Sequence, residues 1–209
     1  MIVLYWVDIF SILSNVIFFL PAYEAYKRNR KLRALIYFFM AWASGLYHTC
    51  LGFDVCLFTY EFHHYLDFFF AQFLIIVAGS YLIIYNNKYR YLDYWILAIG
   101  ALGIVILQVT LEGSLLIQAG IVSFVFVGLV FYWMSTAAIH SLPKYEWDMF
   151  LLGLSLTGGS ITLFVFQNSW YQAYWLIHSV WHIAAGLGQY YLVKLKRPFK
   201  GILPAARRI

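Results

Sequence analysis

Long apolar runs separated by short polar connections dominate the sequence from residue 2 to residue 193. Each run has about 20 residues, the length that an α-helix needs to cross the hydrocarbon core of a bilayer. The pattern therefore predicts an all-α integral membrane protein in which residues 1–209 form a single domain, a seven-transmembrane helix bundle. The predicted helices cover about residues 2–22, 33–52, 62–85, 91–110, 114–135, 148–167 and 171–193.

The composition excludes a soluble globular domain. Hydrophobic residues make up 64% of the chain and charged residues only 11%, whereas about a quarter of the residues in a typical soluble domain are charged. The first apolar run has no basic segment before it and is followed by YEAYKRNRKLR rather than by small residues. We therefore expect a retained first helix and not a cleaved signal peptide.

The positive charges predict how the bundle is oriented. If the N-terminus is outside, every Lys and Arg falls on the cytoplasmic side, and the opposite side carries only the acidic Asp54, Glu61 and Glu112. Cytoplasmic loops are enriched in Lys and Arg, so we expect the N-terminus outside and the C-terminus cytoplasmic. The net charge of +5 then favours anionic inner-leaflet lipid as a partner, and we expect no nucleic acid. The cations are Lys27, Arg28, Arg30, Lys31, Arg33, Lys88, Arg90, Lys144, Lys194, Lys196, Arg197, Lys200, Arg207 and Arg208.

Both cysteines of the chain, Cys50 and Cys56, fall in the first predicted outer connection, TCLGFDVC. An oxidising outer face favours a disulfide between them, which would join the end of the second helix to the loop entering the third. The alternative is two free thiols at the membrane interface.

Five polar residues lie at a similar depth in three of the predicted helices. Ser44 and His48 are four residues apart and share a face in the outer half of the second helix. Asp67 lies just over a turn inside the third helix. His178 and His182 share a face of the seventh helix, about two and three turns from its outer end. Ionisable residues inside membrane spans are costly and point to function when they can meet.

Three imidazoles and a carboxylate predict a zinc site. A catalytic zinc takes three protein ligands and keeps one position open, which His48, His178 and His182 would provide. Asp67 would bind through water or orient a solvent molecule, and Ser44 would steady a developing oxyanion. Taken alone, the H-x3-H pair is more simply a hydrogen-bonded core pair, but hydrocarbon offers no water to three scattered imidazoles.

Three further ionisable residues carry weaker predictions. His63 and His64 open the third helix as interfacial histidines, and His63, one turn before Asp67, is a reserve ligand. Asp8 lies toward the outer end of the first helix. It either supports the site or faces lipid headgroups.

The combination of Ser44-x3-His48, Asp67 and His178-x3-His182 in a seven-helix pattern resembles the CREST superfamily. That superfamily includes alkaline ceramidases, progestin and adiponectin receptors, Per1-like proteins and the transmembrane-protein-8 family. The segments SGLYHTCLGFDVCLFTYEFHHYLDFF and IHSVWHIAAG are most similar to the transmembrane-protein-8 and myomaker branch. The resemblance implies Zn2+ held by the three histidines, with Ser44 and Asp67 completing the site.

Two functions follow as expectations. The first is a zinc-dependent intramembrane lipid hydrolase that cuts an amide or ester bond of a ceramide, phospholipid or GPI-type lipid with a metal-activated water. The alternative is a non-enzymatic, myomaker-like membrane-fusion or remodelling protein with a structural zinc site. Either reading implies membrane lipids as partners, a possible homodimer, and a plasma-membrane or secretory-pathway location. The metal site would lie toward the extracellular or luminal side.

Overall fold

In the computed structural model, the described residues are 2–83, 90–112, 114–139, 147–167, 169 and 173–195. They form α-helices joined by turns and short 3-10 segments, and no strand occurs among them, which confirms the predicted all-α class. The elements are α1 (Ile2–Ser14), η1 (Asn15–Phe18), α2 (Phe19–Lys27), α3 (Lys31–Phe53), α4 (Tyr60–Ile83), α5 (Arg90–Thr110), α6 (Leu115–Ile139), α7 (Trp147–Phe166) and α8 (Tyr174–Leu195). Each predicted apolar run coincides with a helical segment whose ends differ by a few residues.

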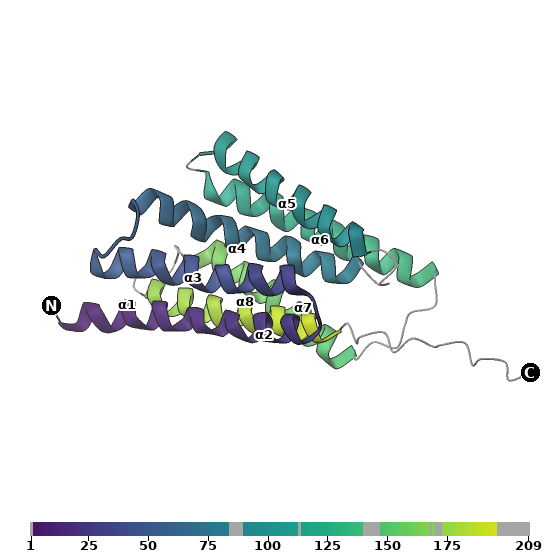
Figure 1. Ribbon diagram of the computed structural model, residues 1–209, viewed down its shortest axis with the longest axis horizontal. Helices are drawn as coiled ribbons and strands as arrows, with labels where there is room; N and C mark the ends of the chain where they lie inside the picture. The colour runs from purple at the N-terminus through teal and green to yellow at the C-terminus, as the bar shows by residue number, and fades with distance from the viewer. Residues whose placement is uncertain are drawn as a thin grey trace, which may run out of the picture.

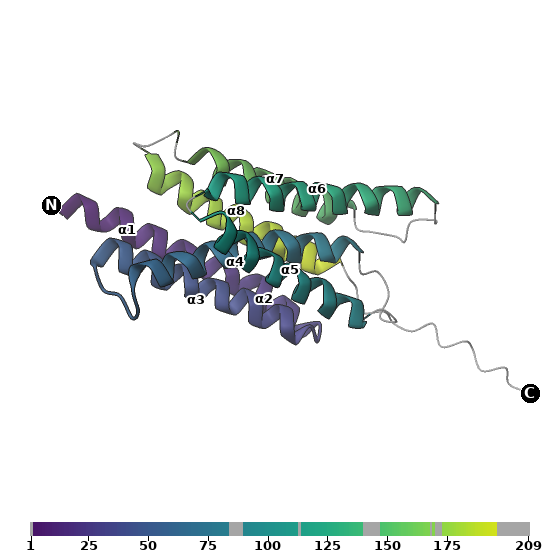
Figure 2. The same ribbon diagram turned by 90° about the horizontal axis from the view of Figure 1, so that it is seen from above.

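The helices lie side by side, with α4 and α8 in the middle of the bundle (Figure 1, Figure 2). The first segment, α1 to α2, packs against α3 and α8, and α7 packs along α8. On the other side, α5 and α6 pack against α4. The end of α3 and the starts of α4 and α8 lie at the same end of the bundle as the start of α1 (Figure 1).

The apolar core runs along the contacts between α3, α4 and α8. Tyr37, Met40, Val77 and Leu192 have 0% exposure. Close backbone approach is needed between α7 and α8, because a Cβ added to Gly188 would lie 2.6 Å from the Oγ1 atom of Thr157. Small residues that admit such close packing are typical of helix contacts in membranes.

Four helices are long and apolar enough to cross a membrane. They cover Asp8–Lys27, Lys31–Phe53, Tyr60–Tyr81 and Asp148–Phe166. Shorter apolar stretches, Tyr94–Thr110 and Ile117–Phe131, lie in α5 and α6. This count concerns the described residues alone. It gives the chain membrane-helix character by length and composition.

The first predicted helix is longer than expected and is not uniform. It continues to Lys27, past the expected end at residue 22, and Pro21 lies in the first turn of α2. Proline has no N–H to donate, so the turn before it lacks one helical hydrogen bond. At the same place the Ser14 hydroxyl and the Asn15 amide donate to the Ser11 carbonyl, at 2.7 and 2.9 Å. These features accompany the tighter 3-10 turn.

One cation, Arg33 in the first turn of α3, is buried in the bundle. Arg33 lies in α3, is only 2% exposed, and its guanidinium carbon is 3.7 Å from the centroid of the Tyr81 ring on α4. Stacking on an aromatic face gives this buried guanidinium a favourable partner. Lys88, Lys144 and the basic residues of 196–208 lie outside the described residues.

The connection between α3 and α4 is held at both ends. A disulfide joins Cys50 and Cys56, as predicted. Helix α3 ends where Asp54 takes a left-handed conformation with φ of 57°, and its N–H donates to the Cys50 carbonyl at 3.1 Å. At the other end the Phe58 N–H donates to Nε2 of His63 at 3.2 Å. The start of α4 is thereby fixed relative to the end of α3.

We expect replacement of both Cys50 and Cys56 by Ser to lower the free energy of unfolding by about 2 kcal/mol, because closing so short a loop restricts the unfolded chain. Thermal unfolding in detergent, beside untreated wild type and wild type treated with a reductant, measures this loss. Peptide mapping under non-reducing conditions should recover the two cysteines in one linked peptide. Labelling of both thiols in unreduced protein would contradict the disulfide.

Candidate metal centre

Three histidines from two helices meet in the interior of the bundle. His48 comes from the last turns of α3, and His178 and His182 come from successive turns of α8. One ring nitrogen of each lies within 4.8 Å of the others, and all three side chains are buried. The spacing of four residues on α8 puts two imidazoles on one face, and α3 brings the third across to them. The group is close enough to hold a metal ion.

The orientation of His178 is set by Gln167, which directly follows α7. Nδ1 of His178 lies 2.6 Å from Oε1 of Gln167. An amide oxygen only accepts, so Nδ1 carries the proton and the lone pair of this neutral ring is at Nε2. That Nε2 atom lies 2.9 Å from Nε2 of His48. Tyr174 stacks on the same ring, with centroids 5.2 Å apart.

The orientation of His182 is set by Ser14 at the end of α1. The Ser14 hydroxyl donates its single proton to the Ser11 carbonyl at 2.7 Å. Its oxygen is therefore the acceptor in the 2.7 Å contact with Nδ1 of His182. As in His178, the proton is on Nδ1 and the lone pair is on Nε2, which faces the other histidines.

Ser44 and Asp67 lie against this cluster. Ser44 has 0% exposure, and its Oγ is 3.4 Å from Nε2 of His182. Its side chain also lies beside the carboxyl of Asp67, which α4 brings in from the other side. The carboxyl of Asp67 is 3% exposed, and its Oδ1 has no hydrogen-bond partner among the described residues. A buried carboxylate oxygen without a partner is costly, so the site has an acceptor still to be satisfied.

The donor set fits a metal ion. Three neutral imidazoles, two with Nε2 fixed as the free nitrogen, are the nitrogen ligands that zinc and related metals prefer. Two imidazole nitrogens on one zinc are about 3.3 Å apart in a tetrahedral site, so the 2.9 Å between His48 and His178 requires only a small opening. His48 is the ligand without an outer support, because its only hydrogen bond among the described residues is the one to His178.

The other candidate residues lie outside this cluster. His63 is buried at the start of α4, and its Nε2 accepts the Phe58 N–H, so it supports the loop and does not join the three histidines. His64 packs among aromatic rings, stacked on Tyr60 with centroids 5.8 Å apart. Asp8 lies against Gly52 near the end of α3, where an added Cβ would be 2.5 Å from the Cβ of Asp8.

Sequence reasoning missed Ser14 and Gln167. Neither residue is ionisable, and they lie 168 and 11 residues along the chain from the histidines that they contact. The available signal was weak: polar side chains in or beside apolar helices, at the depth of the ionisable set. Residues that orient metal-binding histidines through the second ring nitrogen commonly have this character.

We expect wild-type protein, purified in detergent without chelators, to contain about one metal ion per chain. The His48→Ala and His178→Ala variants should lose it, because each removes one of three ligands. His64→Ala is the matched control and should keep the metal. Mass spectrometry of the elements gives both the amount and the identity. A wild-type chain free of metal would mean that the histidines are a hydrogen-bonded core group.

We expect Ser14→Ala and Gln167→Leu to weaken metal binding about 10–100-fold, because the imidazoles would lose the partners that hold Nε2 toward the site. Competition with a chromophoric chelator measures the affinity. Ser80→Ala is the control, because Ser80 is equally buried but donates to the Val77 carbonyl of its own helix at 2.7 Å. Unchanged affinity in both site variants would show that these two residues do not orient the ligands.

The sequence matches a family described as "Protein of unknown function (DUF3522)" over residues 4–183. No curated protein matches the chain. The matched segment covers more than four-fifths of the 209 residues and includes every residue of the candidate metal centre, from Ser14 to His182. The chain therefore belongs to the family described as "Protein of unknown function (DUF3522)".

Proposed function

We propose that this protein is a zinc-dependent hydrolase that cuts an amide or ester bond of a membrane lipid. One observation carries the proposal: a buried carboxyl, Asp67, with an oxygen that lacks a partner, lies one hydroxyl away from three histidines close enough to hold a metal ion. Hydrolytic sites of this kind need three ligands, an open position and a nearby proton acceptor.

A zinc ion held by His48, His178 and His182 would supply a Lewis acid and lower the pKa of a bound water toward neutrality. Proton transfer and the positioning of the carboxyl would fall to side chains of the protein. Oδ1 of Asp67 accepts the proton of the attacking water and passes it to the leaving group. With a metal on Nε2 of His182, the Ser44 hydroxyl would be free to donate its proton to Asp67 and so hold the carboxyl against the histidines. We therefore assign Ser44 a positioning role in preference to stabilisation of the oxyanion.

The membrane setting supports a lipid as the substrate. We propose seven membrane spans, with the N-terminus outside and the C-terminus cytoplasmic, in the plasma membrane or a secretory-pathway membrane. The Cys50–Cys56 disulfide supports this orientation, because it lies at the end of the bundle that the proposal exposes to an oxidising compartment. His48 lies near the same end, in the last turns of α3, so the proposed substrate would enter from the outer leaflet.

The proposed mechanism agrees with the resemblance to the CREST superfamily, which we propose as the wider group to which this family belongs. The support is the spatial grouping of residues that the sequence motifs named separately. Ser44 and His48 from one helix, Asp67 from a second, and His178 and His182 from a third form one cluster. Lipid amidases and esterases of that superfamily would then be the guide to substrate class.

A second candidate is a non-enzymatic membrane-remodelling or fusion protein with a structural zinc. The observation that favours it is the depth of the ligands: His48 and His178 are 4% exposed and His182 is 0% exposed. A metal there would tie α3 to α8, and closed sites of this kind are typical of structural zinc. The activity would then lie on other surfaces of the bundle.

We expect metal-loaded wild type to hydrolyse at least one member of a panel of ceramides and acyl phospholipids. Asp67→Asn should lower the rate about 10²–10⁴-fold while keeping the metal, because it removes the proton acceptor but no metal ligand. Product release measured by mass spectrometry, beside metal content for each variant, tests this. Asp148→Asn, at an exposed carboxyl in the first turn of α7, is the matched control and should keep full activity.

Two results would favour the second candidate. One is metal-loaded protein that is inert toward the whole panel. The other is cell mixing on expression that survives Asp67→Asn, combined with a His178→Ala variant that unfolds at a lower temperature. Hydrolysis that Asp67→Asn leaves unchanged would remove Asp67 from the mechanism.

A further inference from the structure

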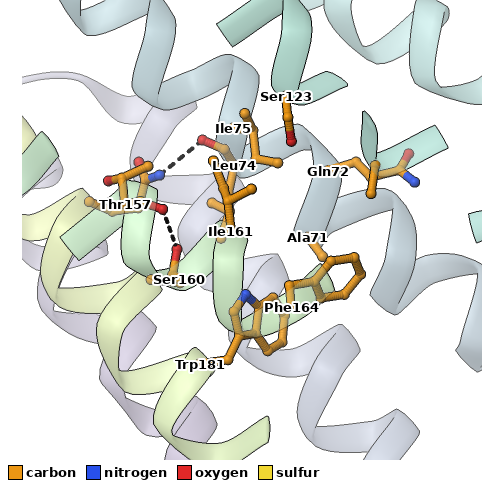
Figure 3. A pocket seen from close by; sticks show the side chains of 13 residues that line it. Ala71, Gln72, Leu74, Ile75, Ser123, Thr157, Ser160, Ile161, Phe164 and Trp181 are labelled. Carbon is orange, nitrogen blue, oxygen red and sulfur yellow. Dashed lines mark hydrogen bonds between the residues drawn. The ribbon is translucent and has the colours of Figure 1, made fainter. Parts of the chain in front are cut away.

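A second polar cluster lies beyond the histidines, in a cavity between α4, α6, α7 and α8. We call it the four-helix cavity, and its volume open to the centre of a water molecule is about 30 Å³. Its walls are mostly apolar side chains, among them Leu74, Phe164 and Trp181. Polar side chains also line it, with Gln72 and Ser123 on one side and Thr157 and Ser160 on the other in the view of Figure 3.

Part of this polar lining is satisfied by the protein itself. The Ser160 hydroxyl donates to the Thr157 carbonyl at 2.7 Å (Figure 3). Gln189 donates to the Leu74 carbonyl and accepts from the Tyr37 hydroxyl, both at 2.9 Å. These groups need no further partner, so they do not by themselves indicate a ligand.

Three polar atoms on three different helices have no partner among the described residues. They are Oε1 of Gln72 on α4, Oγ of Ser123 on α6 and Oγ1 of Thr157 on α7. The Gln72 amide does use its nitrogen, which donates to Oε1 of Gln118 at 3.0 Å. Buried polar atoms in native proteins nearly always have a partner, and each exception needs an explanation. The shared explanation here is a polar occupant of the cavity.

We propose that the four-helix cavity binds about two water molecules that join α4, α6 and α7. A water needs about 10–15 Å³ of the space open to its centre, so the volume of about 30 Å³ suits two. Water donates to the Gln72 carbonyl oxygen and can both donate to and accept from the two hydroxyls. A lipid acyl chain fills the same space but leaves all three atoms without a hydrogen bond.

The proposal gives α6 a polar attachment to the bundle. Among the described residues, α6 packs mainly on α4 and barely contacts α7. Bound waters would connect Ser123 of α6 to Thr157 of α7 across this sparse contact. Bridging waters are nearly as favourable as direct hydrogen bonds, and hydrocarbon around the bundle supplies no competing partner. This inference does not depend on the hydrolase proposal.

The sign of a stability change tests the proposal. Thr157→Val keeps the shape of the side chain and removes its hydroxyl. With water bound, the variant loses a hydrogen bond, so we expect its melting temperature in detergent to fall by a few degrees relative to Thr162→Val. Thr162 is the control because it lies on the same helix, is more exposed, and donates to the Gly158 carbonyl at 3.1 Å. A melting temperature that is unchanged or higher means a dry cavity and overturns the proposal.

Hydroxyl-radical labelling of wild type gives a second, independent test, because radiolysis of bound water oxidises the side chains beside it. Leu74 and Leu97 are a matched pair, 3% and 2% exposed, of which only Leu74 lines the cavity. We expect Leu74 to be oxidised several-fold faster than Leu97. Equal rates, or a co-purified lipid whose removal is needed before Leu74 reacts, overturn the proposal.

Discussion

A histidine in the interior of an apolar bundle must find hydrogen-bond partners in the protein, because hydrocarbon supplies none. The candidate metal centre depends on this constraint. Gln167 and Ser14 each accept a hydrogen bond from the Nδ1–H of one imidazole, and the Nε2 atoms of these two rings face the site. The ring orientations are thus set before any ligand binds, and the same contacts tie α1, α7 and α8 together around the site.

Helix α3 is attached to its neighbours at several levels. The disulfide fixes its end at Cys50, while His48 and Ser44 face α8 and α4. Further along, the hydroxyl of Tyr37 donates to Gln189 of α8 at 2.9 Å, in the middle of the core. A helix held at several levels gives His48 a fixed position although no outer residue supports its ring. This explains how one unsupported ligand can still belong to an ordered centre.

Polar side chains in the interior satisfy their hydrogen bonds in two ways. Hydroxyls such as those of Ser80 and Ser160 donate to a carbonyl of their own helix and leave nothing to satisfy. Others reach between helices, as Gln72 does to Gln118. Neither way satisfies Oδ1 of Asp67 or the three polar atoms around the four-helix cavity, and the same holds for one side-chain atom each of Asn15, His63 and Gln108. An unsatisfied atom therefore points to a ligand or solvent only where other observations agree, as the three histidines do at Asp67.

The sequence was sufficient for the features that depend on local pattern. Apolar runs of membrane-spanning length determined the helices, and a spacing of four placed His178 beside His182 and Ser44 beside His48. The Cys50–Cys56 pairing followed from a short loop that contains both cysteines of the chain. These predictions need only helix geometry and the hydrophobic effect, both of which act over a few residues.

Only the tertiary structure could reveal the side-chain contacts between one helical segment and another. It paired Ser14 with His182 and Gln167 with His178, contacts for which periodicity has no signal because neither partner is charged. It also buried Arg33 against Tyr81, a contact that the charge pattern does not predict. The physical reason is the same in each case: which polar atom satisfies which depends on how the helices pack and rotate against one another, and a linear pattern does not record that arrangement.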